Sequence, residues 1–89
     1  MKFSVLTTVY KKETPRNLRK SLLSSYHQTI KPAEIILVCD GELTEDLDRE
    51  IKKLQREIPI LKVFHLPENL GSGPASLFGV NQCQTEFIA

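Results

Sequence analysis

Tyr10 directly follows the apolar run FSVLTTV, and Asp40 directly follows a second apolar run, EIILVC. A tyrosine ring can lie flat against a planar base. A carboxylate can accept a hydrogen bond from the N3–H of uracil, a donor that cytosine lacks. Thr8 and the backbone near Val9 offer further hydrogen bonds to a base or a ribose. These residue types fit a uridine nucleotide better than a purine.

Each of these residues also has a simpler interpretation. In the simpler interpretation, Tyr10 covers the edge of a sheet and binds nothing. Asp40 begins an Asp-Gly pair, which is common in turns. Glu13 and the two lysines before it fit an ordinary solvated loop. The residue types alone leave both interpretations open.

The histidines and cysteines show no catalytic or metal-binding spacing. His27 and His65 stand alone, without a second ligand or a nucleophile nearby in the sequence, so structural or surface roles are favoured. Cys39 lies inside an apolar run and is expected to act as a small hydrophobic residue, and Cys83 lies near the end of a predicted helix. The absence of a disulfide pattern favours a reducing, cytoplasmic compartment.

Periodicity predicts strands and helices in strict alternation. Thr14 and Thr44 are candidate N-caps, and Pro59 should end the second helix. The expected strands cover 3–9, 34–39, 61–66 and the start of a fourth at 86–89, and the expected helices cover 15–28, 45–58 and 74–83. Alternation with short connections predicts an α/β fold, an open and mostly parallel sheet with helices on both faces. Ligands bind such sheets at the carboxyl ends of the strands, where Thr8, Tyr10, Asp40 and the loop at 67–73 should meet.

The glycines of that loop do not form a dinucleotide fingerprint. Gly71 and Gly73 have the spacing of its first two glycines, but they follow the third predicted strand, and Ser76 stands at the third position. A dinucleotide-binding domain is therefore disfavoured. A P-loop is excluded because the chain contains no Gly-Lys-Ser or Gly-Lys-Thr.

The overall composition limits the classes of partner. The chain has 89 residues and a formal net charge of +1, and its basic residues are spread along it, so nucleic acid is not expected as a partner. No apolar stretch approaches the roughly 20 residues that cross a bilayer. The length accommodates one small domain or part of a larger one.

Three motifs in this order resemble the N-terminal nucleotide-binding part of family 2 inverting glycosyltransferases, which have the GT-A fold. They are Thr8-Val9-Tyr10-Lys11, the stretch from Leu22 to Gln28-Thr29, and the run from Ile35 to Asp40-Gly41. The stretch NLGSGPA, followed by a helix and a strand, continues the resemblance to the end of the chain. The most similar subset is the bacterial enzymes that build lipopolysaccharide or capsular polysaccharide.

The resemblance implies a role for individual residues. Tyr10 would stack on uracil, Asp40 would bind its N3–H, Thr8 and Val9 would line the base pocket, and Glu13 would approach the ribose. The loop residues Gly71, Ser72 and Gly73 would approach the diphosphate. Many members carry Arg-Asn where this chain has Ser76-Leu77, so an arginine on the diphosphate is not expected.

The resemblance also implies groups that the 89 residues do not contain. The family binds a divalent cation, Mn²⁺ or Mg²⁺, through an Asp-x-Asp that is expected beyond residue 89, and a later carboxylate serves as base. We therefore expect residues 1–89 to be the nucleotide-sugar-binding part of a longer chain and inactive alone. The exposed edge of the unfinished fourth strand makes self-association possible.

The function implied is transfer of a sugar from a nucleotide-sugar, expected to be a UDP-sugar, to a saccharide or lipid-linked acceptor in cell-surface polysaccharide synthesis. Such enzymes are cytoplasmic and often work at the inner membrane surface. The alternative is a non-catalytic α/β module that binds a nucleotide or a protein.

Overall fold

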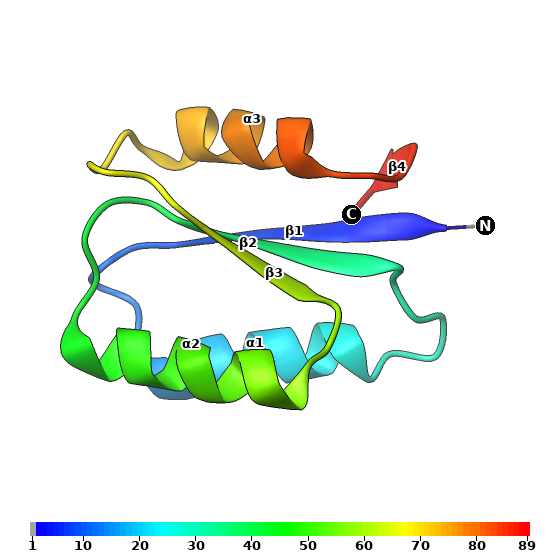
Figure 1. The fold of residues 1–89 in the computed structure, drawn as a ribbon, viewed down its shortest axis with the longest axis horizontal. Coiled ribbons are helices and arrows are strands. Elements are labelled where there is room, and N and C mark those ends of the chain that lie inside the picture. The colour runs from blue at the N-terminus through cyan, green and yellow to red at the C-terminus, as the bar shows by residue number, and fades with distance from the viewer. Residues whose placement is uncertain (1) are drawn as a thin grey trace.

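Strands and helices alternate along the chain as the sequence predicts. The structure is a computed structural model that describes residues 2–89 (Figure 1). Its elements are β1 (Phe3–Val9), α1 (Pro15–Tyr26), β2 (Glu34–Cys39), α2 (Glu45–Glu57), β3 (Leu61–His65), α3 (Ser72–Gln82) and β4 (Phe87–Ile88).

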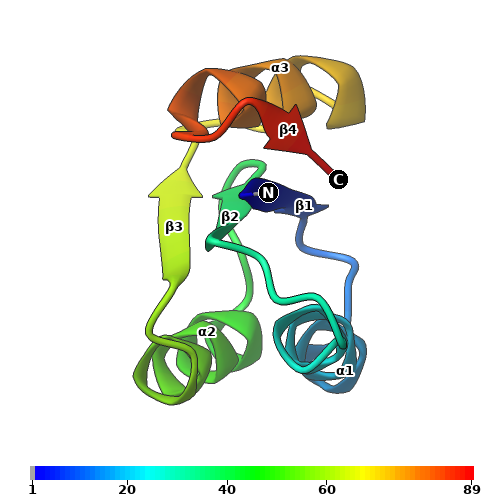
Figure 2. The ribbon, with the colours of Figure 1, turned by 90° about the vertical axis from the view of Figure 1, so that its right-hand side faces the viewer.

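The four strands form one parallel sheet in the order β3-β2-β1-β4. Val9 pairs with Cys39, and Cys39 pairs with His65, so the first three strands end level with one another. Helices α1 and α2 cover one face of the sheet and α3 covers the other (Figures 1 and 2). The predicted fold class, with parallel strands and helices on both faces, is confirmed.

Both predicted threonine caps begin their helices. The Thr14 side chain accepts a hydrogen bond from the backbone N–H of Asn17, and Thr44 accepts one from Leu47 N–H. These bonds satisfy amide groups that have no partner within a helix. The first turn of α2 also carries three acidic residues, which the positive end of the helix dipole stabilises.

The core has one layer on each face of the sheet. Every residue of β2 is buried. The larger layer lies under α1 and α2. Its members from these helices are Leu18, Leu22, Leu47, Ile51 and Leu54, and Ile58 joins them directly after α2. The smaller layer, under α3, includes Ile36, Val38 and Ala75. Helix α3 comes so close to the sheet that a Cβ on Gly79 would lie 2.3 Å from Leu6 Cδ1.

Two helix boundaries differ from the prediction by two residues, and two others, the ends of α2 and α3, differ by one. Helix α3 begins at Ser72 rather than 74, because Pro74 stands in the first turn, where a missing N–H breaks no helical hydrogen bond. Helix α1 ends at Tyr26, two residues early, and His27 caps it by donating its N–H to the Leu23 carbonyl. Both shifts lie within a single turn and leave the topology unchanged.

Candidate functional site

The ends of β1 and β2 and the loop before α3 enclose a hollow of about 290 Å³. Parallel strands that end level bring their following residues to one edge of the sheet, which is where ligands bind in open α/β folds. The residues that line the hollow are Thr8, Val9, Tyr10, Asp40, Asn69, Gly71 and Ser72. Six of the eight residues selected from the sequence therefore meet there.

Asp40 joins the end of β2 to the loop between β3 and α3. It is only 5% exposed, and its Oδ1 and Oδ2 accept hydrogen bonds from the backbone N–H groups of Leu70 (2.7 Å) and Gly71 (3.0 Å). A carboxylate has about four acceptor positions, so these two bonds leave capacity for a ligand donor. Asp40 therefore holds the β3–α3 loop against the end of β2 and still has acceptor capacity for a ligand.

Gly41 allows the two loops to approach. Its φ is +88°, and a Cβ at this position would lie 2.7 Å from the backbone nitrogen of Asn69. Side chains rarely adopt such a φ, and the atom in the way belongs to backbone that cannot swing aside. The glycine after Asp40 therefore sets the distance between the β2 end and the β3–α3 loop.

Tyr10 leaves its ring available to a ligand. It is 46% exposed although it lines the hollow, whereas its neighbour Val9 is buried in the core. Its carbonyl accepts the N–H of Glu13 (3.0 Å), which closes a turn after β1 and fixes the backbone beneath the ring. An exposed aromatic ring beside buried hydrogen-bonding groups suits a planar ligand.

Glu13 and Gly73 do not reach this hollow. The Glu13 carboxylate turns back to the backbone N–H of Thr14 (2.8 Å), where it helps to begin α1. Gly73 lies in the first turn of α3, and a Cβ there would meet nothing within 4 Å. Neither residue lines the hollow, and the ribose contact of Glu13 and the diphosphate contact of Gly73 stay predictions.

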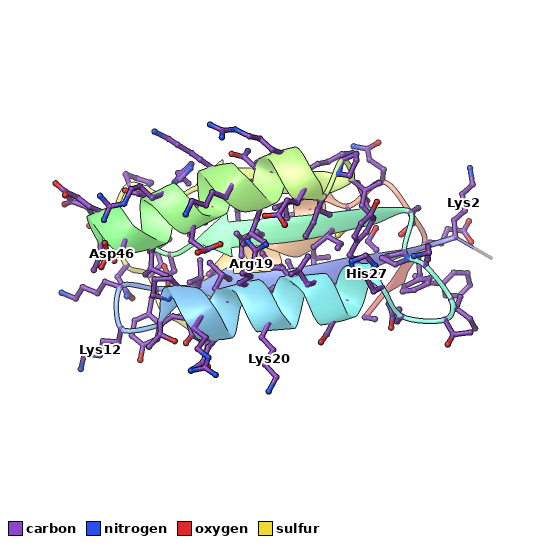
Figure 3. All side chains as sticks on the ribbon, turned by 90° about the horizontal axis from the view of Figure 1, so that it is seen from below. Lys2, Lys12, Arg19, Lys20, His27 and Asp46 are labelled. Atoms are coloured by element: carbon purple, nitrogen blue, oxygen red, sulfur yellow. The ribbon has the colours of Figure 1, made fainter. Side chains whose placement is uncertain are left out.

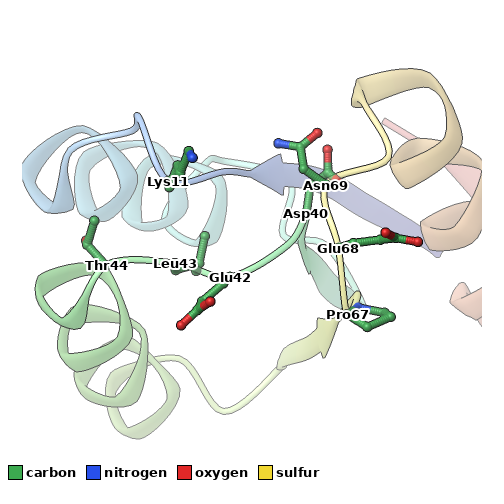
Figure 4. A pocket seen from close by; sticks show the side chains of 8 residues that line it. All are labelled: Lys11, Asp40, Glu42, Leu43, Thr44, Pro67, Glu68 and Asn69. Carbon is green, nitrogen blue, oxygen red and sulfur yellow. The ribbon is translucent and has the colours of Figure 1, made fainter.

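Asn69 is the residue that the sequence analysis missed. It lines the hollow, and its Oδ1 accepts the N–H of Gly71 (3.1 Å), which leaves the amide Nδ2 as a donor. Asn69 and Asp40 also border a second hollow of about 400 Å³, with Lys11, Glu42 and four other residues (Figure 4). Its position in the sequence, two residues before the first glycine of the loop, is the feature that could have identified Asn69 as a site residue.

The remaining candidates for chemistry are inert or remote. Burial, and then the nearby charge of Asp48, raises the pKa of the Cys39 thiol to about 12, so the thiol stays protonated. His27 and His65 are both exposed. Within residues 2–89, no three metal-ligating side chains are grouped to hold an ion.

A family model described as "Glycosyl transferase family 2" matches residues 4–89. An Escherichia coli protein, "UDP-Gal:alpha-D-GlcNAc-diphosphoundecaprenol beta-1,3-galactosyltransferase", is 40% identical over 87 residues, which are 98% of this chain and 31% of that protein. The "Amylovoran biosynthesis glycosyltransferase AmsE" of Erwinia amylovora is 37% identical over 98% of this chain and 32% of its own length. The chain thus spans about a third of these relatives.

Solved structures of S. aureus TarS share the fold. One superposes with a TM-score of 0.73 at 28% identity, over 99% of this chain and 16% of that chain. A second, of TarS residues 1–349, gives 0.70 at 29% identity, over 99% of this chain and 26% of that chain. The sheet and helices therefore have the GT-A arrangement of a glycosyltransferase, and the chain belongs to glycosyl transferase family 2.

Proposed function

We propose that the hollow binds the nucleotide of a UDP-sugar and that the protein transfers the sugar to a saccharide or lipid-linked acceptor. One observation carries the proposal: an exposed aromatic ring, Tyr10, and a buried carboxylate, Asp40, from adjacent strands border one hollow. The names of two relatives support it, since one includes UDP-Gal and a diphosphoundecaprenol and the other the biosynthesis of amylovoran.

Each group has a distinct task in this proposal. The Tyr10 ring stacks on the base, an interaction worth about 1–3 kcal/mol for a base on an aromatic side chain. A free acceptor position of the Asp40 carboxylate takes the N3–H of uracil. The backbone amides of Leu70 and Gly71 hold this carboxylate in place before the ligand arrives, so binding needs no reorganisation there.

A divalent cation belongs to the proposed reaction, and among residues 2–89 no three metal-ligating side chains are grouped to hold it. When bound in such an enzyme, the ion offsets the charge of the leaving diphosphate. We therefore assign nucleotide binding to the described residues, and neither metal binding nor base catalysis.

We also propose a cytoplasmic location with peripheral contact to the inner membrane, where a lipid-linked acceptor would lie. None of the helices that the structure describes has the length and apolar character to cross a bilayer.

Calorimetric titration with UDP and with CDP tests the nucleotide site. The carboxylate should favour UDP by about tenfold to a hundredfold, because hydrogen bonds to charged groups contribute 1.5–3 kcal/mol. In Asp40→Asn the introduced amide can donate to N3 of cytosine, so the preference should narrow or reverse.

Glu34→Gln is the matched control, since Glu34 is a buried carboxylate at the opposite end of β2. It should lower stability and keep the preference for UDP. An unchanged UDP-to-CDP ratio in Asp40→Asn would show that Asp40 does not read the base.

A further inference from the structure

The segment from Lys11 to Lys31, which contains α1, differs sharply in charge from the rest of the chain. It holds six basic residues and one acidic residue, a net charge of +5. The neighbouring segment 42–57, which contains α2, holds four basic and six acidic residues, a net charge of −2. A nearly neutral protein thus carries a strong positive charge on one side.

One of the six basic residues is neutralised within the fold. Arg19 bridges the two helices, with Nη1 2.8 Å from Glu50 Oε2 and Nη2 bonded to Glu57. These carboxylates raise the pKa of the guanidinium above its ordinary value. Figure 3 shows Arg19 between the helices, while Lys20 and Lys12 point away from α2.

The other five form what we call the basic edge: Lys11, Lys12, Arg16, Lys20 and Lys31. All five are exposed, and within residues 2–89 none has a carboxylate within 4.0 Å. Arg16 and Lys20 are four residues apart on α1 and therefore share one face of the helix. Lys11 and Lys12 follow the end of β1 and Lys31 precedes the start of β2, so the edge runs along α1 between opposite ends of the sheet.

An exposed apolar side chain lies at the far end of this edge. Ile30 is 69% exposed and directly precedes Lys31. It also borders a shallow apolar hollow with Phe3, Phe87 and Ile88. An exposed isoleucine gains no favourable contact with the charged phosphates of a nucleic acid, whereas it can be buried at the boundary between lipid headgroups and acyl chains.

We propose that the basic edge contacts anionic phospholipid headgroups, with Ile30 placed at the lipid interface. Each lysine or arginine close to an anionic bilayer strengthens binding about fivefold, so five together can hold a protein at the membrane surface. The acidic residues of α2 would face away from the lipid and prevent the molecule from lying on that side.

The inference rests on the proposed function in one respect, the lipid-linked acceptor. Lys11 and Lys12 directly follow Tyr10, and Lys11 borders the hollow next to the nucleotide site. Docking by the basic edge would therefore bring the rim of the donor site close to the bilayer surface, where such an acceptor presents its diphosphate.

Cosedimentation with vesicles tests the proposal, using phosphatidylcholine alone and phosphatidylcholine with about one third phosphatidylglycerol. The wild type should bind only the anionic vesicles, and added salt should weaken binding. Arg16→Glu/Lys20→Glu should weaken binding at least about thirtyfold. Lys52→Glu/Lys53→Glu changes the net charge equally on exposed positions of α2 and should alter binding less than about threefold.

The possible results separate the surface from the donor site. Absent wild-type binding, or an equal loss in both double variants, would overturn the basic edge. Dependence on Arg16 and Lys20 for an RNA oligonucleotide but not for vesicles would reassign it to nucleic acid. UDP affinity should be the same in all three proteins; failure to bind UDP with intact vesicle binding would remove the nucleotide proposal and leave the lipid surface standing.

Discussion

Two buried carboxylates lie at opposite ends of the same strand. Glu34 begins β2 and is 3% exposed, and Asp40 follows its last residue and is 5% exposed. Both are charged groups in a segment that is otherwise apolar and fully buried. The two carboxylates nevertheless differ in their hydrogen-bond partners and in how much acceptor capacity remains free.

Side chains and one amide of the protein surround Glu34. Its Oε2 accepts from the Ser4 hydroxyl (2.6 Å) and from the backbone N–H of Gln84, and its Oε1 accepts from Lys62 Nζ (2.8 Å). Burial alone would raise the pKa of this carboxyl, but the hydrogen bonds from Lys62, Ser4 and Gln84 outweigh it and hold the pKa below its ordinary value of 4.5. Glu34 on β2 thus links Ser4 of β1, Lys62 of β3 and the segment that leads into β4.

Asp40 is held by two backbone amides alone and borders open space on two sides. Among residues 2–89 no cationic side chain lies within 4.0 Å of it, and it keeps free acceptor positions. The comparison shows that burial of a carboxylate does not by itself mark a ligand site. What distinguishes the two is unused hydrogen-bonding capacity beside a hollow.

Glu34→Ala should have the largest effect on folding. Removal of the carboxylate leaves Ser4, Gln84 N–H and Lys62 without their partner. We therefore expect the free energy of unfolding to fall by about 3 kcal/mol. This is the lower end of the range for a broken buried ion pair, because Lys62 is half exposed. Urea denaturation measures it. UDP affinity of the folded protein should change less than about threefold; a large loss of affinity would erase the distinction between the two ends.

Gly41→Ala should damage the open end instead. The positive φ costs about 1–2 kcal/mol for a residue with a Cβ, and the clash with Asn69 backbone adds to this. We expect about 2 kcal/mol of destabilisation and at least a tenfold loss of UDP affinity, because the two loops must separate. Gly73→Ala, where a Cβ meets nothing within 4 Å, is the matched control and should leave both measurements nearly unchanged.

Tyr10→Ala should affect binding without affecting stability. Loss of the stacking surface should weaken UDP binding about tenfold, within the range for a base on an aromatic ring. The side chain is 46% exposed, so the unfolding free energy should change by less than about 0.5 kcal/mol. Tyr10→Phe keeps the ring and should bind normally; an equal loss in both variants would point to the hydroxyl group instead of stacking.

The smallest expected effect is a difference in acid sensitivity between the wild type and Glu34→Gln. Since the folded-state pKa of Glu34 lies below its ordinary 4.5, the unfolded chain binds more protons in that range, and stability falls as the pH drops below about 4.5. Glu34→Gln lacks this group, so its unfolding free energy should fall less steeply with acid. Identical acid slopes in the two proteins would show that Glu34 does not carry this pH dependence.

Much of the fold was predictable because its signals are local. Thr14 and Thr44 cap helices through hydrogen bonds to residues three positions ahead, and the α2 stripe follows from helical spacing alone. Short connections between alternating elements then require parallel strands. The meeting of Thr8, Tyr10 and Asp40 at one edge follows from that topology.

Other features depended on residues far apart in the chain. Glu13 and Gly73 were expected at the site but do not line the hollow: the Glu13 carboxylate accepts the N–H of Thr14, and Gly73 lies in the first turn of α3. Asn69 entered the site because Gly41, 28 positions earlier, lets its backbone approach. The buried Glu34 could not be foreseen, since its partners lie 28 to 50 residues away.

The sequence by itself determined which elements form, their order, and the edge at which the candidate ligand residues gather, because periodicity, capping and connection length act over a few residues. Only the tertiary structure decided which of two similar carboxylates is enclosed by partners and which faces a hollow. That outcome depends on hydrogen bonds between distant segments, and these exist only once the sheet has brought the segments together.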